Sequence, residues 1–305
     1  MKKKRTPAGR PETLRAPVTG DDGLIRLNRY LALNGIASRR RADQLIEEGE
    51  VMVDDEIVTE MGLKIDPTKQ RVEIDGVVLR PEGERKQYYL LNKPSGVVCT
   101  NEERENRPRA IDLISDKRKG RIYTVGRLDE DTVGLVLLTN DGDFAYRLSH
   151  PRYGIEKLYR VVVHGRITED AVAKLKKGVR LPEFRATFDR VKVQKRSEMR
   201  STLLVTLREG KNREIRRVFA KLGFPVRDLR RVEYGCLSER GLKVGHWRPL
   251  LREEIAELLE LANEENAGPP PAKVRGPRKP GRFGAPGGKG PRRGGSNARS
   301  TVRRG

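Results

Sequence analysis

The chain has 305 residues, a formal net charge of +22 and an aromatic content of only 5%. This length predicts about two domains, and the small apolar share indicates that part of the chain stays outside any hydrophobic core. We expect neither a secretory leader nor a membrane anchor, because no apolar run follows the basic N-terminus and none reaches the length of a span. Two distant cysteines and three scattered histidines exclude a disulfide framework and a metal motif, so we expect a reduced, cytoplasmic protein.

The positive charge is concentrated at the two ends of the chain. Residues 266–305 contain 11 Lys or Arg and no Asp or Glu, and residues 1–20 hold six basic residues and one Glu. Such arms favour a polyanion as partner because the release of counterions drives binding, although a tail that only aids solubility is the alternative. We expect residues 1–23 and 264–305 to be disordered, since segments rich in Pro, Gly and Arg bury too little apolar surface to fold.

Residues 24–84 are predicted to form a small unit of two helices followed by β-structure. Ser38 is placed to cap the second helix, and VMVDDEIV, from Val51, reads as a hairpin around an Asp-Asp turn. RVEIDGVVL, from Arg71, is predicted to add one more short strand.

Three arginines, Arg39, Arg40 and Arg41, occupy the first turn of that second helix. Cations are unfavourable there because the helix dipole is positive at its N-terminus. The pattern indicates that the charges serve an external anion such as a phosphate, and a merely solvated face is the alternative.

Residues 85–263 are predicted to form a second domain of the α+β class around a mixed, largely antiparallel sheet. The expected strands, in chain order, are QYYLLNK, RIYTV, GLVLLTN, LYRVVVH, FDRVKVQ, STLLVTL and LRRVEY. The expected helices are DFAYRLS, TEDAVAKLKK with Thr168 as its cap, a segment that begins at Asn212, and REEIAELLELA.

One loop of this domain has the properties of a catalytic site. In VGRLDEDTVGLVLLTNDG, residues 125–142, Arg127 and Asp129 come just before the apolar run Gly134–Leu138. A carboxylate in such a connection can be partly desolvated and kept ionised by a nearby arginine. The alternative is an aspartate that merely caps a turn.

A second segment supplies candidate arginines. EGKNREIRRVFAKLG, residues 209–223, carries an apolar helical stripe with Arg213, Arg216 and Arg217 at the helix start. Because the helix dipole disfavours cations there, they need an anion, which is either a phosphate or a buried carboxylate such as Asp129.

The N-terminal unit resembles the S4 RNA-binding domain. The resemblance rests on RLNRYLALNGIASRRRADQLIEEGEVMVDDE, with its Ser-Arg-Arg turn and its Gly-x-Val-x-Val hairpin start, over about 50 residues. It implies that a set of residues in the two helices faces RNA, namely Arg26, Arg29, Ser38, Arg39 and Arg40.

The second domain resembles the pseudouridine synthases of the RsuA and RluB type. The resemblance rests on four segments in the family's order: LNKPSGVV, VGRLDEDTVGLVLLTNDG, HPRYGIEKLYRVVV and EGKNREIRRVFAKLGFPVRDLRRVEYG. Val133, Lys211 and Glu214 depart from residues common in the family. The asparagine, arginine and glutamate before Ile215 make the chain most similar to the B-type enzymes, which act on RNA of the large ribosomal subunit.

The resemblance implies a role for each site residue. Asp129 would be the catalytic aspartate, as nucleophile or as base; Arg216 would pair with it. Tyr159 would stack on the uracil, although an ordinary strand tyrosine is the alternative. Arg127 would fill the space that a flipped base leaves or hold the flanking phosphate. Further phosphate contacts would come from Lys93, Lys211, Arg213 and Arg217.

We therefore expect an isomerase that converts a uridine of ribosomal RNA to pseudouridine without a cofactor or metal. We expect it to be a monomer, and its favoured substrate to be a precursor particle of the large ribosomal subunit. One alternative is a small-subunit RNA substrate, and another is a non-catalytic RNA-binding or ribosome-assembly protein. A tRNA ligase with an S4 domain is disfavoured because the sequence has no ATP-binding signature.

Overall fold

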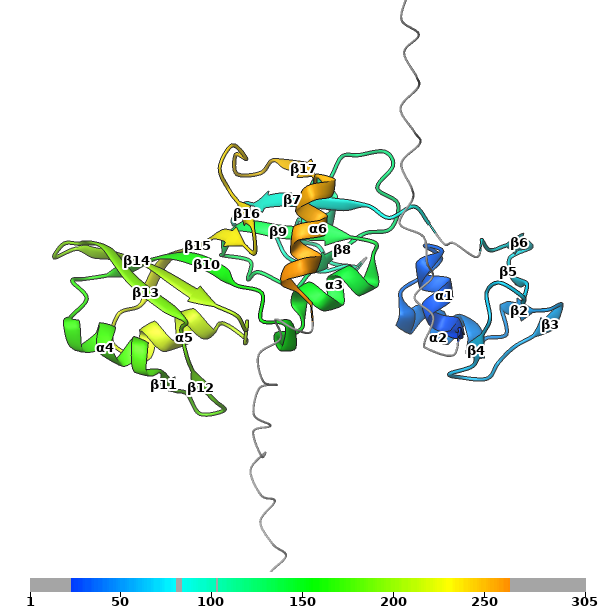
Figure 1. The fold of residues 1–305 in the computed structure, drawn as a ribbon, viewed down its shortest axis with the longest axis horizontal. Helices are drawn as coiled ribbons and strands as arrows, with labels where there is room; N and C mark the ends of the chain where they lie inside the picture. Colours follow the sequence, from blue (N-terminus) through cyan, green and yellow to red (C-terminus); the bar gives the residue numbers. More distant parts are fainter. Residues whose placement is uncertain (1–22, 81–83, 103, 264–305) are drawn as a thin grey trace, which may run out of the picture. The chain divides into compact units, whose positions relative to one another are not determined.

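The computed structural model describes residues 23–80, 84–102 and 104–263 of the chain (Figure 1). The basic arms predicted at 1–23 and 264–305 lie outside this part, apart from Gly23. Buried apolar side chains of residues 25–79 form one hydrophobic cluster, and those of residues 89–262 form two others. Within the described ranges, no helix is long and apolar enough to cross a membrane.

The N-terminal part contains two short helices, α1 (Leu27–Leu33) and α2 (Arg39–Glu47). The Ser38 hydroxyl accepts a hydrogen bond from the Arg41 backbone N–H at 3.2 Å, which confirms the predicted cap of α2. Apolar residues of both helices, Leu31 and Ile46 among them, are fully buried in one cluster. The helices are held together by this shared apolar contact.

Two hairpins follow the helices. β2 (Val51–Val53) and β3 (Glu56–Ile57) pair around Asp54 and Asp55, whose φ angles of 52° and 68° are those of a tight hairpin turn. The prediction of a single strand after Arg71 is wrong. β5 (Val72–Ile74) and β6 (Val77–Val78) form a second hairpin, because Asp75 and Gly76 adopt positive φ angles and reverse the chain. β1 (Ile25–Arg26) pairs separately with β4 (Lys64–Ile65).

The second part is built on a sheet of nine described strands, in the order β13-β14-β10-β15-β9-β7-β17, with β16 beside β15 and β8 beside β9. Every pairing in it is antiparallel except that of β9 with β15, which confirms the predicted mixed, largely antiparallel sheet and the α+β class. The strands are β7 (Tyr88–Lys93), β8 (Tyr123–Val125), β9 (Val133–Thr139), β10 (Lys157–His164), β13 (Arg190–Arg196), β14 (Arg200–Leu207), β15 (Val226–Tyr234), β16 (Leu237–Ser238) and β17 (Trp247–Pro249).

Helices cover opposite faces of the two halves of this sheet (Figure 1). α4 (Glu169–Lys177) and α5 (Glu214–Lys221) pack on one face of β10, β14 and β15, whereas α3 (Gly142–Ser149) and α6 (Arg252–Leu261) pack on the opposite face of β7 and β9. Alternate residues of β9 therefore belong to different clusters: Val136 joins the first and Leu135 the second. Short elements complete the fold, namely 3-10 turns at Ala110–Leu113 and Pro151–Tyr153 and the ribbon of β11 (Val179–Arg180) and β12 (Arg185–Ala186).

The parallel contact between β9 and β15 places the predicted catalytic loop. Gly134 pairs with Arg231 and has a φ of 118°, and a Cβ atom at position 134 would collide with the Arg231 backbone. Glycine is therefore required at this point. The strand that follows Asp129 is buried in the middle of the sheet, so the loop before it has a rigid base.

Candidate active site

A cleft of about 630 Å³ opens beside this loop. Its rim carries charged side chains from two segments, residues 127–130 and 211–214. Its base is apolar and aromatic, from Leu128, Tyr159, Ile215 and Leu229. A concave site with an apolar base and convergent polar groups is typical of ligand binding.

Asp129 lies at the rim, with its side chain 30% exposed. The nearest ion-pair partner is Arg213, whose Nη1 is 3.6 Å from the Asp129 Oδ2. Arg213 also reaches Asp131, from Nη2 to Oδ2 at 3.4 Å. The carboxylate is thus partly withdrawn from water and faces a guanidinium.

The backbone of Arg213 accounts for this reach. The helix expected from Asn212 begins at Glu214 instead, and Arg213 is its N-cap with a φ of 45°. A left-handed conformation is unfavourable for a residue other than glycine, and such conformations concentrate at functional sites. Glu214 is buried, which raises the pKa of its carboxyl, and it accepts a hydrogen bond from the Lys211 N–H at 3.2 Å.

The expected pair between Arg216 and Asp129 is not present, and this prediction is wrong. The Arg216 Nη2 lies 3.1 Å from the Asp131 Oδ1 and donates to the Asp131 carbonyl oxygen and the Thr132 hydroxyl, at 3.3 and 3.4 Å. Position 216 is two residues inside α5, so its side chain meets the far end of the loop. Arg213, at the helix start, is the one that meets Asp129.

Tyr159, which the resemblance assigns to stacking on the uracil, forms part of the base of the cleft. It lies on β10, is only 7% exposed and contributes to the first hydrophobic cluster as well as to the cleft lining. Its hydroxyl oxygen accepts a hydrogen bond from the Nη1 of Arg231 at 3.4 Å. The strand role and the cleft role are thus compatible in one residue.

Two buried cations behind the cleft were missed from the sequence. Arg231 is 2% exposed and Lys157 is 8% exposed. The Lys157 Nζ donates to the carbonyl oxygens of Ile155 and Arg208, both at 3.0 Å. Burial, with the Arg231 charge as a second cause, lowers the pKa of Lys157 to about 7. Strand alternation could have revealed both, because Lys157 is in phase with Tyr159, and Arg231 with Leu229.

Lys93, a predicted phosphate contact, is not on the surface of the cleft. Its side chain is fully buried, and its Nζ donates to the carbonyl oxygens of Val97, Pro94 and Glu130 at 2.7, 2.9 and 3.1 Å. Burial lowers the pKa of this amine. Because Glu130 directly follows Asp129, Lys93 fixes the predicted catalytic loop to the turn after β7.

The other predicted phosphate ligands differ in their surroundings. Arg127 is exposed and lines the cleft. Lys211 also lines it, but its Nζ lies 2.5 Å from Glu209 and 4.3 Å from the centre of the Phe184 ring. Arg217 pairs with Glu183 outside the cleft lining. Of Arg127, Lys211, Arg213 and Arg217, it is therefore Arg127 and Arg213 that are better placed to bind an incoming anion.

Two acidic side chains at the rim, Glu105 and Glu130, hold Arg107. Arg107 donates from Nη2 to Glu105 at 2.7 Å and from Nη1 to Glu130 at 2.8 Å. The Arg107 hydrogen bonds lower the pKa of the half-buried Glu105 to about 2, so the group stays ionised at neutral pH. The acids keep Arg107 oriented at the rim rather than across the cleft.

The residues predicted to face RNA in the N-terminal part are largely on its surface. Arg26, Arg39 and Arg40 are exposed. Ser38 is occupied as the cap of α2, and Arg29 is half-buried with its Nη2 2.5 Å from the Asp143 carboxylate. Arg39 and Arg40 thus present the clearest cationic surface of this set.

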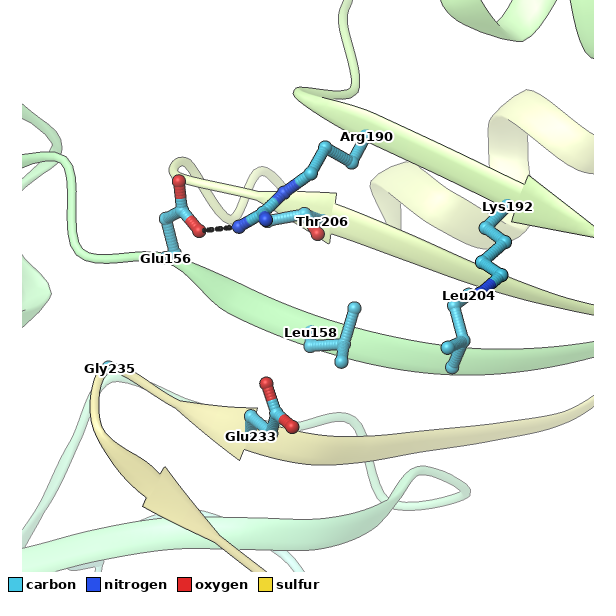
Figure 2. A pocket seen from close by; sticks show the side chains of 8 residues that line it. All are labelled: Glu156, Leu158, Arg190, Lys192, Leu204, Thr206, Glu233 and Gly235. Atoms are coloured by element: carbon cyan, nitrogen blue, oxygen red, sulfur yellow. Dashed lines mark hydrogen bonds and ion pairs between the residues drawn. The ribbon is translucent and has the colours of Figure 1, made fainter.

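A smaller hollow of about 180 Å³ lies on the other face of the sheet, where α4 and α5 do not pack (Figure 2). Leu158 and Leu204 form its floor, and Arg190 pairs with Glu156 across it. Its charges are mixed, and none of the predicted site residues lines it. Among the described residues, no group of His, Cys, Asp and Glu side chains has the arrangement of a metal site.

Comparisons with known proteins show which family the chain belongs to. The family model of RNA pseudouridylate synthases matches residues 87–221, and that of the S4 domain matches residues 25–72. A ribosomal large subunit pseudouridine synthase B of Bacillus subtilis is 40% identical over 240 residues, which are 78% of this chain and 97% of the relative.

The chain belongs to the RNA pseudouridylate synthase family. The dual-specificity RNA pseudouridine synthase RluF of Escherichia coli is 34% identical, over 83% of this chain and 85% of that one. A crystal structure of a pseudouridylate synthase matches with a TM-score of 0.54 and 31% identity, over 77% of this chain and 99% of that one. The synthase is thus an isomerase with an N-terminal S4 domain.

Proposed function

We propose that the synthase converts one uridine of large-subunit ribosomal RNA to pseudouridine in the cleft beside Asp129. In this reaction the C1′–N1 bond breaks, the uracil turns, and C5 bonds to C1′ of the same ribose. The observation that carries the proposal is the meeting of a partly exposed carboxylate, a guanidinium 3.6 Å away and a buried tyrosine in one cleft. The large-subunit substrate is inferred from the Bacillus relative's name.

Asp129 acts at the ribose, as a nucleophile or as a base. A carboxylate at this edge can approach C1′ only when the uridine has left the base stack, and flipping costs a few kcal/mol. Tyr159 stacks on the flipped uracil, and such stacking contributes about 1–3 kcal/mol. Arg127 fills the vacated space or holds the flanking phosphate.

Arg213 and Arg216 together take the role that the sequence assigned to Arg216 alone. Arg213 orients Asp129 and sets a positive charge 3.6 Å from its carboxylate. Arg216 positions the loop through the Asp131 and Thr132 oxygen atoms. Lys211 and Arg217 exchange their acidic partners for phosphates when RNA binds.

The N-terminal S4 unit, residues 24–84, holds the RNA while residues 85–263 perform the chemistry. The exposed Arg39 and Arg40 bind phosphates, and Arg26 and Arg29 extend the same contact. The synthase works as a monomer on a precursor of the large ribosomal subunit.

The proposal is tested by mapping pseudouridine in ribosomal RNA from cells with and without this protein. We expect one large-subunit position to lose its pseudouridine and to regain it when the wild-type chain is restored. The loss of a small-subunit position alone would overturn the substrate assignment. Unchanged modification of both RNAs would favour a non-catalytic role in ribosome assembly.

A further inference from the structure

Arg231 on β15 lies directly behind the tyrosine of the cleft. It is opposite Tyr159 in the register of β10 and β15, at a point where that register shifts. Its Nε donates to the Leu135 carbonyl oxygen at 2.6 Å, and its Nη1 donates to the Tyr159 hydroxyl oxygen at 3.4 Å. Arg231 therefore joins β9, which follows the catalytic loop, to the tyrosine on β10.

The charge of Arg231 has no acidic counterpart. Within the part of the chain that the structure describes, no carboxylate forms an ion pair with it, and its Nη2 has no hydrogen-bond partner. The guanidinium instead lies 4.9 Å from the centre of the Tyr234 ring and 6.0 Å from that of Tyr159. Lys157, 5.5 Å from the Tyr234 ring centre, is a second buried cation beside it.

Such an arrangement opposes folding. A buried charge without a counter-ion is costly, and replacement of buried ions by apolar residues is often neutral or stabilising. The backbone of Arg231 is nevertheless held closely. It pairs with Gly134, and the two backbones lie so near each other that a Cβ atom at position 134 would collide with Arg231. A residue that is costly and yet rigidly placed beside a functional group points to a role in the reaction.

We propose that Arg231 is a positioning residue that orients the Tyr159 hydroxyl and sets a positive charge beneath the ring on which the uracil stacks. This rests on the proposed function of the cleft. When the C1′–N1 bond breaks, its electron pair stays on the uracil. C5 then bonds to C1′, the C5 proton leaves and N1 takes up a proton, so that composition is unchanged. A fixed cation in a site that excludes water stabilises the negative charge of the detached base.

The test compares Arg231→Met with Arg230→Met in single-turnover assays on ribosomal RNA transcripts, with RNA affinity measured in parallel. Arg230 is the matched control because it neighbours Arg231 but faces the opposite side of the sheet, with its Nε 2.5 Å from Glu239. We expect Arg231→Met to slow the chemical step at least about tenfold while the Kd for RNA changes less than about twofold. Arg230→Met leaves both within about twofold.

A double-mutant cycle separates positioning from structural support. If Arg231 acts through Tyr159, Arg231→Met in a Tyr159→Phe background slows the reaction less than about threefold further. An equal loss in both backgrounds would overturn the role through the Tyr159 hydroxyl, whereas unchanged turnover, or a loss that follows a lower unfolding temperature, would overturn the proposal as a whole. Arg231→Lys, which keeps the cation, carries the same cycle if the methionine variant fails to fold.

Asp129→Asn in the same assay distinguishes this inference from the proposed function. If Asp129→Asn is inactive and Arg231→Met is normal, only the role of Arg231 fails. If Asp129→Asn remains active, the proposed site itself fails.

Discussion

Charges at the mouth of the cleft and charges behind it are handled in opposite ways. At the mouth, Asp129 and Asp131 are partly exposed and face Arg213 and Arg216 across 3.1–3.6 Å. Behind it, the buried cations Lys93, Lys157 and Arg231 have no carboxylate partner among the described residues and donate chiefly to backbone carbonyls.

The difference follows from what each region does. Partly hydrated ion pairs contribute little to stability and can be exchanged for the phosphates of an incoming RNA. Cations that donate to carbonyls in a dry interior fix the backbone at several points at once. The mouth is therefore adaptable and the region behind it rigid.

The largest effect on stability is expected at Lys93. Lys93→Met leaves three carbonyl oxygens without their donor in a place closed to water. We expect a loss of about 3 kcal/mol, which lowers the unfolding temperature by roughly 6–12 °C. Thermal unfolding measures it, with the exposed Lys192→Met as a control that stays within about 0.5 kcal/mol. Equal unfolding temperatures for the two variants would contradict the claim that the buried cations behind the cleft support the fold.

An intermediate effect is expected at Lys157, and it depends on pH. Because its pKa is lowered to about 7 in the folded chain, the unfolded chain binds more protons between pH 7 and about 10. Stability therefore rises with pH in this window, by at most about 1.4 kcal/mol per pH unit. Lys157→Met removes this contribution, so denaturant unfolding from pH 7 to 9 should show a flatter slope than in the wild-type chain. A slope that stays unchanged would mean that Lys157 is charged in the folded protein.

The smallest effect is expected at the mouth. Asp131→Asn breaks the pairs to Arg213 and Arg216, which lie at 3.4 and 3.1 Å with the Asp131 side chain 48% exposed. We expect the free energy of unfolding to change by less than about 1 kcal/mol. Turnover is retained because Arg216 still holds the loop through the carbonyl oxygen of residue 131 and the Thr132 hydroxyl, which the substitution leaves in place. Chemical denaturation checks the change in stability. A loss as large as that of Lys93→Met would show that the mouth is part of the rigid support.

Local patterns in the sequence predicted much of the fold. Ser38 caps α2 because its hydroxyl is the right acceptor at that position, and Asp54 and Asp55 tolerate the positive φ of a hairpin. The second hairpin was missed because an Asp-Gly pair between short β-branched runs was read as part of one strand. The parallel pairing of β9 with β15 joins residues about 100 positions apart, and local propensity carries no information on it.

The arrangement of the site also depends on features that local sequence patterns do not specify. The motifs brought Asp129, Tyr159 and Arg213 to one cleft, but which arginine meets which aspartate depends on where α5 begins. Lys93 was misjudged because lysine is rarely buried, and its carbonyl partners in two separate segments, residues 94–97 and residue 130, cannot be foreseen from its motif.

The central claim is that Asp129 performs the chemistry, and tritium release from RNA that contains 5-tritiated uridine tests it most directly. Asp129→Asn should release no tritium while it binds RNA within about twofold of the wild-type Kd, because the amide cannot act as nucleophile or base. Asp131→Asn, two residues away at the same rim, is the matched control and should still release it. Release by Asp129→Asn at a rate near that of the wild-type chain would contradict the account.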